Sequence, residues 1–238
     1  MMSIRFKSLV LRISVLVCVL TTPSLVTLGQ KAPEKSQPQN EFLGGISNGV
    51  YKNPFFGFEL EVPENWTKFD SGEVDTAKNL GVEALRSESD RTNKLLEEAT
   101  RAEVVVLALG KFPLGSIENS ALAIGVGKQP SSKITAKMVA EAGKSILIKN
   151  PRNRLLSDVK TETISGKDFA TFEIELGMYG QKIPLRYYAA MIDDYSLTIS
   201  MSYSDNESLQ KMVKALQSIR FSRGSNRMRE VAQFINAH

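Results

Sequence analysis

The sequence predicts an α+β layer fold, in which an antiparallel β-sheet is packed by helices. The clearest strand, residues 195–203, alternates apolar side chains with small hydroxyl side chains, as a strand with one face in the core does. Short turns at 165–166 and 193–194 join successive strand-like runs, which is typical of antiparallel hairpins. Stretches with helical periodicity, 135–149 and 205–219, stand alone between or after these runs, and this order favours an antiparallel sheet covered by helices.

The first strand of the domain is predicted within residues 50–62. Its apolar positions, which alternate with Gly57, Glu59 and Glu61, are Phe56, Phe58, Leu60 and Val62. Pro63 ends the strand, and Trp66, the only tryptophan of the chain, follows it. We expect Trp66 to be mostly buried and to anchor this strand to the core.

Residues 75–101 are charged and rich in helix-forming types, and they predict two helices or one bent helix. The apolar positions of the two stripes are Ala77, Leu80, Ala84 and Leu85 in the first, and Leu95, Leu96 and Ala99 in the second. Glu88 and Thr92 fall where a single continuous stripe would need apolar residues.

The middle of the chain alternates between strands and a helix. Val104–Leu109 is apolar without alternation, which predicts a central strand covered on both faces, and Ala121–Val126 is the next strand. Thr135 is expected to cap a helix that stops at Asn150-Pro151. The buried side of this helix is predicted to consist of Met138, Ala142 and Ile146, with Val139 beside it.

Four strand-like runs and a final helix complete the domain. The runs are 155–164, 170–176, 183–189 and 195–203. Ser204 and Glu207 have the spacing of a capping box, which predicts a helix start at this point. The apolar face of that helix is Leu209, Met212, Val213, Leu216 and Ile219.

The N-terminal residues have the three parts of a secretory signal. A basic start is followed by an apolar run at 13–20 and by small residues in Thr27–Gly29. The basic residues are Arg5, Lys7 and Arg12. We expect cleavage after Gly29, which makes residues 1–29 a signal peptide and the mature protein an exported one, periplasmic or secreted. The alternative is an uncleaved anchor, but the run is shorter than the roughly 20 apolar residues of a spanning helix.

Composition divides the rest of the chain into three parts. Residues 30–48 are polar and rich in Gln, Pro and Gly, so we expect a flexible linker. Residues 49–222 form one domain, and residues 223–238 form a basic, amphipathic C-terminal tail.

The side chains of the mature chain exclude several kinds of chemistry. The only cysteine, Cys18, lies in the signal peptide, and the only histidine, His238, is the last residue. A thiol nucleophile, a Ser-His-Asp triad and a tetrahedral Cys/His metal site are therefore absent. The mature chain holds 27 basic and 26 acidic residues, and this balance argues against nucleic acid as a partner. We expect a protein that is not an enzyme and has no cofactor.

Short segments at both ends of the domain resemble PsbP-like domains. Gly49–Asn53, Phe56–Leu60 and Val62–Trp66 resemble the family's opening Y-x-N-x-x-F-G-F-x-L-x-x-P-x-x-W, and Leu209–Phe221 is similar to its terminal helix, which ends in S-x-x-F. The family includes the extrinsic photosystem II subunit, the Mog-type Ran-binding protein and exported bacterial proteins. The resemblance implies an antiparallel sheet flanked by helices on both faces, the PsbP/Mog-like α/β/α sandwich. It supplies no catalytic residue.

Three short motifs have a structural interpretation that we favour over a catalytic one. Ser204-Asp205-Asn206 followed by Ser208-Leu-Gln-Lys211 shares elements with penicillin-recognising enzymes, but the order is reversed and no K-T-G follows, so a helix cap is predicted. Gly125–Lys128 lacks the residues of a phosphate loop and predicts the end of a strand. Asp193-Asp194 predicts a turn.

Two surfaces remain open to interpretation. The Ser/Thr face of strand 195–203 is either a flat platform for a partner or a glycan, or a face on which a helix packs closely; we favour packing. The tail places Met228, Val231 and Ile235 on one face, and such a basic amphipathic helix either binds a partner or an anionic membrane, or docks back on the domain. Its candidate partner-binding residues are Arg223, Arg227, Arg229, Phe234 and Ile235.

The sequence therefore predicts a non-catalytic exported binding protein of the cell envelope that acts through protein–protein contacts, with a membrane-associated protein as one kind of partner. The alternatives are a carrier of a small apolar ligand and a hydrolase that uses carboxylates and hydroxyls. Convergent carboxylates in a pocket favour the hydrolase, a dry apolar pocket the carrier, and an exposed apolar surface the binding protein.

Overall fold

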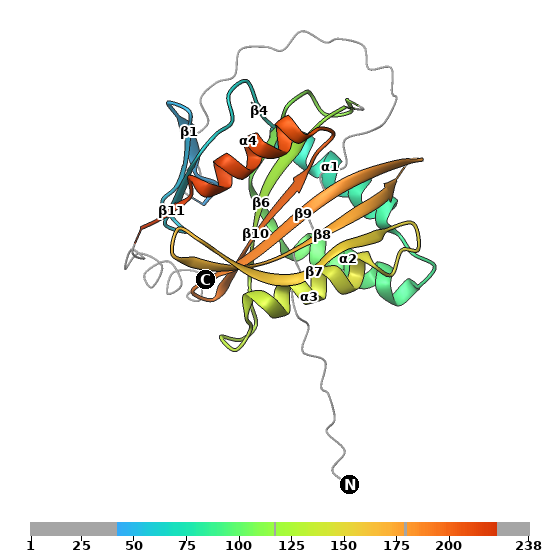
Figure 1. Ribbon diagram of the computed structural model, residues 1–238. Helices are drawn as coiled ribbons and strands as arrows, with labels where there is room; N and C mark the ends of the chain where they lie inside the picture. Colours follow the sequence, from blue (N-terminus) through green and yellow to red (C-terminus); the bar gives the residue numbers. More distant parts are fainter. Residues whose placement is uncertain (1–41, 117, 179, 223–238) are drawn as a thin grey trace.

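The computed structural model describes residues 42–116, 118–178 and 180–222, and a seven-stranded antiparallel sheet forms their centre (Figure 1). In spatial order its strands are β4 (Thr67–Lys68), β5 (Val104–Gly110), β6 (Ala121–Lys128), β10 (Tyr195–Ser202), β9 (Gln181–Ile192), β8 (Lys167–Met178) and β7 (Arg154–Ile164). Each segment predicted to be a strand between residues 104 and 203 forms a strand of this sheet. Sequential hairpins account for β7 to β10, because tight turns separate these strands.

A small four-stranded sheet lies beside the large one. It consists of β1 (Gly45–Ser47), β2 (Val50–Asn53), β3 (Phe58–Glu61) and β11 (Arg220–Phe221), in that order. The strand predicted to end at Val62 is confirmed in β3, where Phe58 and Leu60 are buried. It is shorter than expected because Gly57, at φ 65°, lies in the turn between β2 and β3.

The fold begins earlier in the chain than the sequence indicated. Residues 42–48 were assigned to a flexible linker, yet Phe42, Leu43 and Ile46 pack against the core. The Phe42 ring lies 5.0 Å from the Phe55 ring and 5.1 Å from the Phe56 ring, measured between centroids. The polar composition of the segment hid these apolar side chains; the ring partners of Phe42 lie 13 and 14 residues further on, at Phe55 and Phe56.

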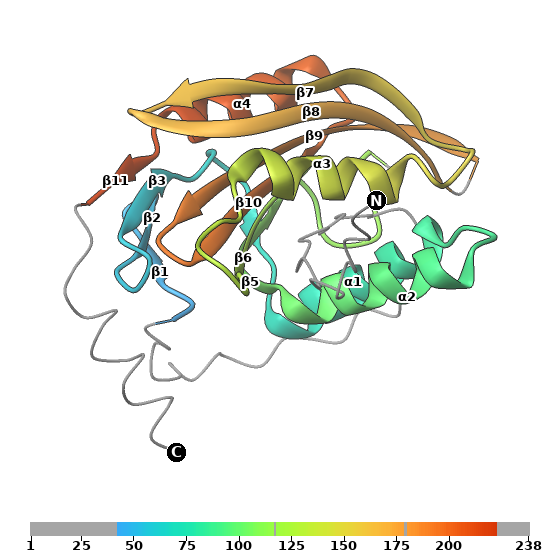
Figure 2. The same cartoon turned by 90° about the horizontal axis from the view of Figure 1, so that it is seen from below.

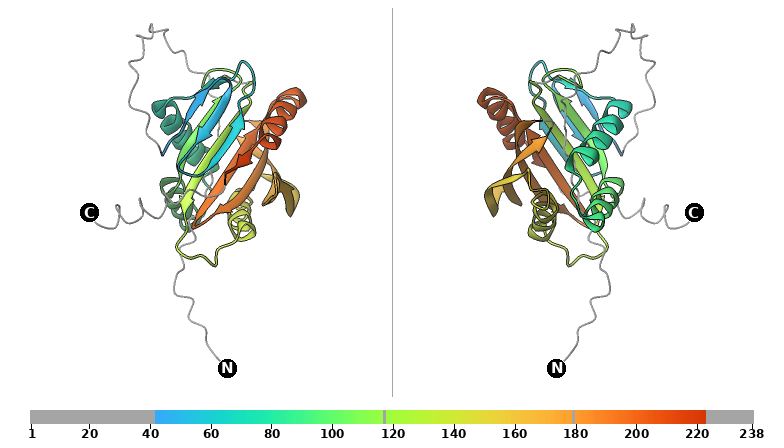
Figure 3. Two further views of the ribbon diagram at one scale, coloured as in Figure 1. Left: turned by 90° about the vertical axis from the view of Figure 1, so that its left-hand side faces the viewer. Right: turned by 90° about the vertical axis from the view of Figure 1, so that its right-hand side faces the viewer.

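Helices cover both faces of the large sheet, which confirms the predicted sandwich (Figures 2 and 3). α1 (Ser71–Leu85), α2 (Asp90–Ala102) and α3 (Ala136–Leu147) pack on one face. α4 (Asn206–Gln217) packs on the other face, together with the small sheet. The side chains of β10 explain the division, since Leu197, Ile199 and Met201 all point to the α4 side.

The predicted helices are present, but in two of them one residue of the expected apolar stripe is exposed. The segment after residue 70 forms two helices, α1 and α2, as one of the two alternatives proposed. Leu95 is 39% exposed and Met138 is 41% exposed, although both were expected to be buried. Leu96 and Ala99 of α2 and Val139 and Ile146 of α3 are buried as expected, and the buried face of α3 continues through Gly143 and Leu147.

Other local predictions agree with the structure. Thr135 caps α3 through a hydrogen bond from the Met138 N–H to its side-chain oxygen, 3.2 Å long. Trp66 is 8% exposed and lies in the core beneath the small sheet. Asp193 adopts a positive φ of 50° in the β9–β10 turn.

Candidate functional site

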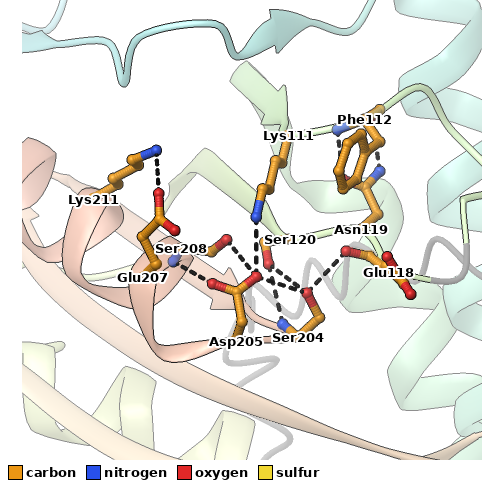
Figure 4. Close-up of polar contacts among 10 residues, drawn as sticks. All are labelled: Lys111, Phe112, Glu118, Asn119, Ser120, Ser204, Asp205, Glu207, Ser208 and Lys211. Carbon is orange, nitrogen blue, oxygen red and sulfur yellow. Dashed lines mark hydrogen bonds and ion pairs between the residues drawn. The ribbon is translucent and has the colours of Figure 1, made fainter.

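The loop between β5 and β6, residues 111–120, is tied to the junction between β10 and α4 (Figure 4). The Lys111 ammonium lies 3.1 Å from the Asp205 carboxylate. The Ser204 hydroxyl donates to the Glu118 carbonyl at 2.8 Å, and the Ser204 N–H donates to the Ser120 hydroxyl at 3.0 Å. Three points of attachment therefore hold the loop against a helix that begins more than eighty residues later in the chain.

Asp205, rather than the predicted Ser204, is the N-cap of α4. Its carboxylate accepts a hydrogen bond from the Ser208 N–H at 2.7 Å and another from the Ser208 hydroxyl at 2.8 Å. Glu207 does not return to the cap as in a capping box but pairs with Lys211 at 2.7 Å. The N-cap predicted from the sequence is therefore one residue too early. Ser204 does not cap α4 because it hydrogen-bonds to the 111–120 loop, through Ser120 and Glu118.

The contacts of Asp205 with Ser208 and Lys111 have a structural role. The Ser208 N–H, followed by the Ser208 hydroxyl and the Lys111 ammonium, holds the pKa of the Asp205 carboxyl well below its usual range. A carboxylate that stays ionised and already accepts these donors is a poor general acid or base near neutral pH. The helix-cap interpretation of Ser204-Asp205-Asn206 is therefore confirmed over the catalytic one.

The same loop holds Phe112 at the surface, where its side chain is 38% exposed. The buried side chain of Asn119 fixes the backbone beside it: the Phe112 N–H donates to Asn119 Oδ1 at 3.0 Å, and Asn119 Nδ2 donates to the Phe112 carbonyl at 2.9 Å. The Lys111 ammonium lies 5.5 Å from the centre of the Phe112 ring. An aromatic side chain is thus presented to solvent by a constrained backbone, and aromatic residues are enriched at protein interfaces.

The small hydroxyl row of β10 does not form a surface. Its four members are buried, and they are Ser196, Thr198, Ser200 and Ser202. Thr198 donates to the Glu103 carboxylate at 2.5 Å, and Ser196 accepts from Gln129 Nε2 at 2.7 Å. The packing interpretation of this row is confirmed, with a buried polar layer beneath the helices instead of an exposed platform.

Glu103 is the ionisable member of this buried layer. It follows the last residue of α2 and is 2% exposed. Burial raises the pKa of the Tyr187 hydroxyl well above its usual value, and the negative charge of Glu103 acts in the same direction. The Lys78 ammonium donates to the Glu103 carbonyl at 3.1 Å, which fastens α1 to the end of α2.

The surface carries several open grooves. A groove of about 630 Å³ lies between α1 and α2, and charged side chains dominate its lining. Glu97, one of the carboxylates that line this groove, forms ion pairs with Arg86 at 3.1 Å and with Arg101 at 3.5 Å. A second groove, of about 410 Å³, lies between α4 and the β7–β8 hairpin. Within the described ranges, no group of three His, Cys, Asp or Glu side chains is placed to hold a metal ion.

Several sequence predictions fall on residues that the structure does not describe. The signal peptide, most of the linker and all five candidate partner-binding residues lie outside the described ranges; those five are Arg223, Arg227, Arg229, Phe234 and Ile235. Among the described helices, none has the length and apolar character needed to cross a membrane.

In the sequence, residues 111–120 are rich in turn-forming types, and nothing in them points to the attachment to Asp205. Lys111 and Asp205 are 94 residues apart, so no local pattern connects them. One local signal was available: an aromatic residue, Phe112, sits among turn-forming residues of a loop, where apolar side chains are otherwise sparse.

Comparison with known proteins gives similarity at the level of fold. No protein-family model and no curated protein matches this sequence. Among solved structures, the chain is similar to the cyanobacterial PsbP (CyanoP) of Synechocystis sp. PCC 6803, with 13% identity and a TM-score of 0.47 over 75% of this chain and 96% of that one. It is also similar to LpqN of Mycobacterium tuberculosis, a protein involved in cell envelope biogenesis, with 12% identity and a TM-score of 0.45 over 70% and 83%.

Identities this low and TM-scores below 0.5 support no statement about activity or partners.

Proposed function

We propose that this chain is a non-catalytic, exported binding protein of the cell envelope, and that it contacts a protein partner through the 111–120 loop. The single observation that carries the proposal is the display of Phe112 by a backbone that Asn119, Lys111 and Ser204 hold in place. A contact residue that is already ordered loses little conformational entropy on binding, so its apolar surface contributes more fully to affinity.

The alternatives receive less support from the described residues. A hydrolase would need carboxylates or hydroxyls that are free to exchange protons in a cleft, whereas Asp205 is tied to Ser208 and Lys111. A carrier of an apolar ligand would need an enclosed apolar pocket. The groove between α1 and α2 is instead lined by charged side chains.

A capture experiment with matched variants tests the proposed contact. Phe112→Ser and Leu95→Ser each remove an apolar side chain of nearly equal exposure, 38% and 39%, from different faces of the protein. Both variants should retain stability within about 0.5 kcal/mol, as is usual for surface positions. The proposal requires that Phe112→Ser loses a protein captured from the native envelope fraction, and that Leu95→Ser keeps it. Equal capture by both variants would refute the assignment of the loop.

The tail is proposed as a second contact. Its three arginines and its apolar stripe match the composition of segments that bind an acidic groove or an anionic membrane surface. Export is proposed from the signal-like N-terminus, which places the protein in the periplasm or outside the cell.

A further inference from the structure

The groove between α4 and the β7–β8 hairpin has apolar side chains and one carboxylate in its lining. Its volume is about 410 Å³. Tyr188 and Leu216 are buried at its floor, and Ile164 and Val213 are half-buried at its sides. Glu162 is the charged residue of its lining; its side chain is 38% exposed, and its carboxylate pairs with the Lys160 ammonium at 2.9 Å.

The described chain ends at Ser222, close to this groove. The ring of Phe221 packs on the ring of Phe169, with 6.3 Å between centroids. Phe169 pairs directly with Glu162 across the β7–β8 ladder. The residues that follow Ser222 therefore start within a few residues' reach of Glu162.

The sequence after Ser222 has the chemistry that this groove would accept. Residues 223–238 contain three arginines and one acidic residue, Glu230. Met228, Val231 and Ile235 follow one another at the spacing of a helix face. Met228 is the sixth residue after Ser222, and an extended segment of six residues spans about 20 Å, which is enough to bring the apolar stripe to the groove.

The other grooves fit this segment less well. A groove of about 380 Å³ beside Ser222 is lined by Lys52 and Arg220 as well as Glu59, so its excess of positive charge opposes an arginine-rich segment. The groove between α1 and α2 lies on the opposite face of the large sheet.

We propose that the groove between α4 and the β7–β8 hairpin is the docking site of the chain's own residues 223–238, which stay there until a partner takes them up. The release of the tail by a partner rests on the proposed function, since it treats the tail as a partner-binding segment. The docking of the tail in the groove does not rest on that function. A short flexible connection gives an effective concentration in the millimolar range, so an intrinsic affinity of about 1 mM or tighter keeps the segment mostly docked.

Paramagnetic relaxation in the exported chain tests the docking without any partner. Cys18 is the only cysteine of the sequence, so Ala232→Cys in a Cys18→Ser background carries one nitroxide label in the tail. We expect the label to broaden the amide signals of Thr163, Ser165 and Gln217, and to leave those of Asn79 and Arg101 unchanged. Glu162→Lys should remove most of this broadening, whereas the matched charge reversal Glu59→Lys at the smaller groove should not.

The relaxation measurement also distinguishes docking at this groove from docking elsewhere and from docking by a second copy of the chain. Broadening around Lys52 and Arg220, or no broadening above that of the free label, would overturn the proposed site. A mixture of spin-labelled chain with isotope-labelled, nitroxide-free chain reports contacts between copies. Broadening of the amide signals of the groove residues in that mixture alone would mean that a second copy supplies the segment. Failure of the capture experiment with Phe112→Ser would leave the docking result intact, because no partner is present here.

Discussion

The side chain of Glu103 occupies the space that a Cβ atom on Gly125 would fill. Glu103 leads from α2 into β5, and Gly125 lies on the neighbouring strand β6, opposite Thr198 of β10. The missing side chain at Gly125 thus makes room for a buried carboxylate, and Thr198 supplies its hydrogen bond.

Gly125→Ala should destabilise the protein by about 1–3 kcal/mol, the usual range for overpacking a well-filled core. Thermal or denaturant unfolding measures this. Gly72→Ala is the matched control, because a Cβ there meets only ordinary contact at 3.4 Å in the first turn of α1. If Gly125→Ala unfolds at the same denaturant concentration as Gly72→Ala, Glu103 does not fill this space in solution. Combining Gly125→Ala with Glu103→Ala should restore part of the loss, which a double-mutant cycle detects as coupling.

Trp66→Ala should cost about 3–5 kcal/mol of unfolding free energy, since a buried aromatic side chain leaves a large cavity when truncated. The ring belongs to the cluster that joins the small sheet to β5, β6 and α4. Chemical denaturation measures the loss, and Phe112→Ala is a control for removal of an exposed aromatic. An unchanged unfolding midpoint for Trp66→Ala would show that the ring is a surface contact.

Asp205→Ala should lower stability by about 1–2 kcal/mol, because it removes the N-cap of α4 and the partner of Lys111. Asp205→Asn keeps a capping oxygen and loses only the charge, so its cost should be smaller. Equal losses for the two variants would contradict the capping role.

The contribution of Asp205 should also depend on pH with a defined sign. Its pKa in the folded protein is lowered, chiefly by the Ser208 N–H, so the stabilisation is complete above the unfolded value of about 3.9 and is lost as the pH falls below it. Unfolding measured from pH 6 to about pH 2 should therefore show a steeper acid loss for the natural chain than for Asp205→Asn. Parallel curves for the two proteins would exclude this linkage.

Deletion of residues 224–238 should leave the folded domain intact and cost less than about 2 kcal/mol, the size expected for a peripheral element. The α4 helix that precedes the tail has its own cap and five buried residues. Association with anionic vesicles or with the captured partner should weaken in the same variant. A larger loss of stability in thermal unfolding would show that the tail is an integral part of the fold.

The exported protein should begin at Gln30. The order of basic, apolar and small residues before Gly29 predicts cleavage there. Intact mass of the exported chain measures it, and a mature form that retains Cys18 would contradict cleavage after Gly29.

The sequence by itself determined the elements whose signals are local. The alternation in 195–203, the turn at Asp193-Asp194 and the cap at Thr135 each depend on neighbours within a few residues, and each is present in the structure. The residue types are also read directly from the sequence, in which Cys18 is the only cysteine and His238 the only histidine.

Only the tertiary structure decided the features that depend on distant partners. Leu95 and Met138 are exposed because the packing of a helix on its sheet, and not its own periodicity, fixes which stripe is buried. Phe42 belongs to the core because Phe55 and Phe56 fold back against it. The loop that presents Phe112 is held by Ser204 and Asp205, from which five strands separate it along the chain. Local sequence patterns do not reveal contacts between residues so far apart in the chain. Such contacts stabilise the protein only after the chain between them has folded and brought the residues together.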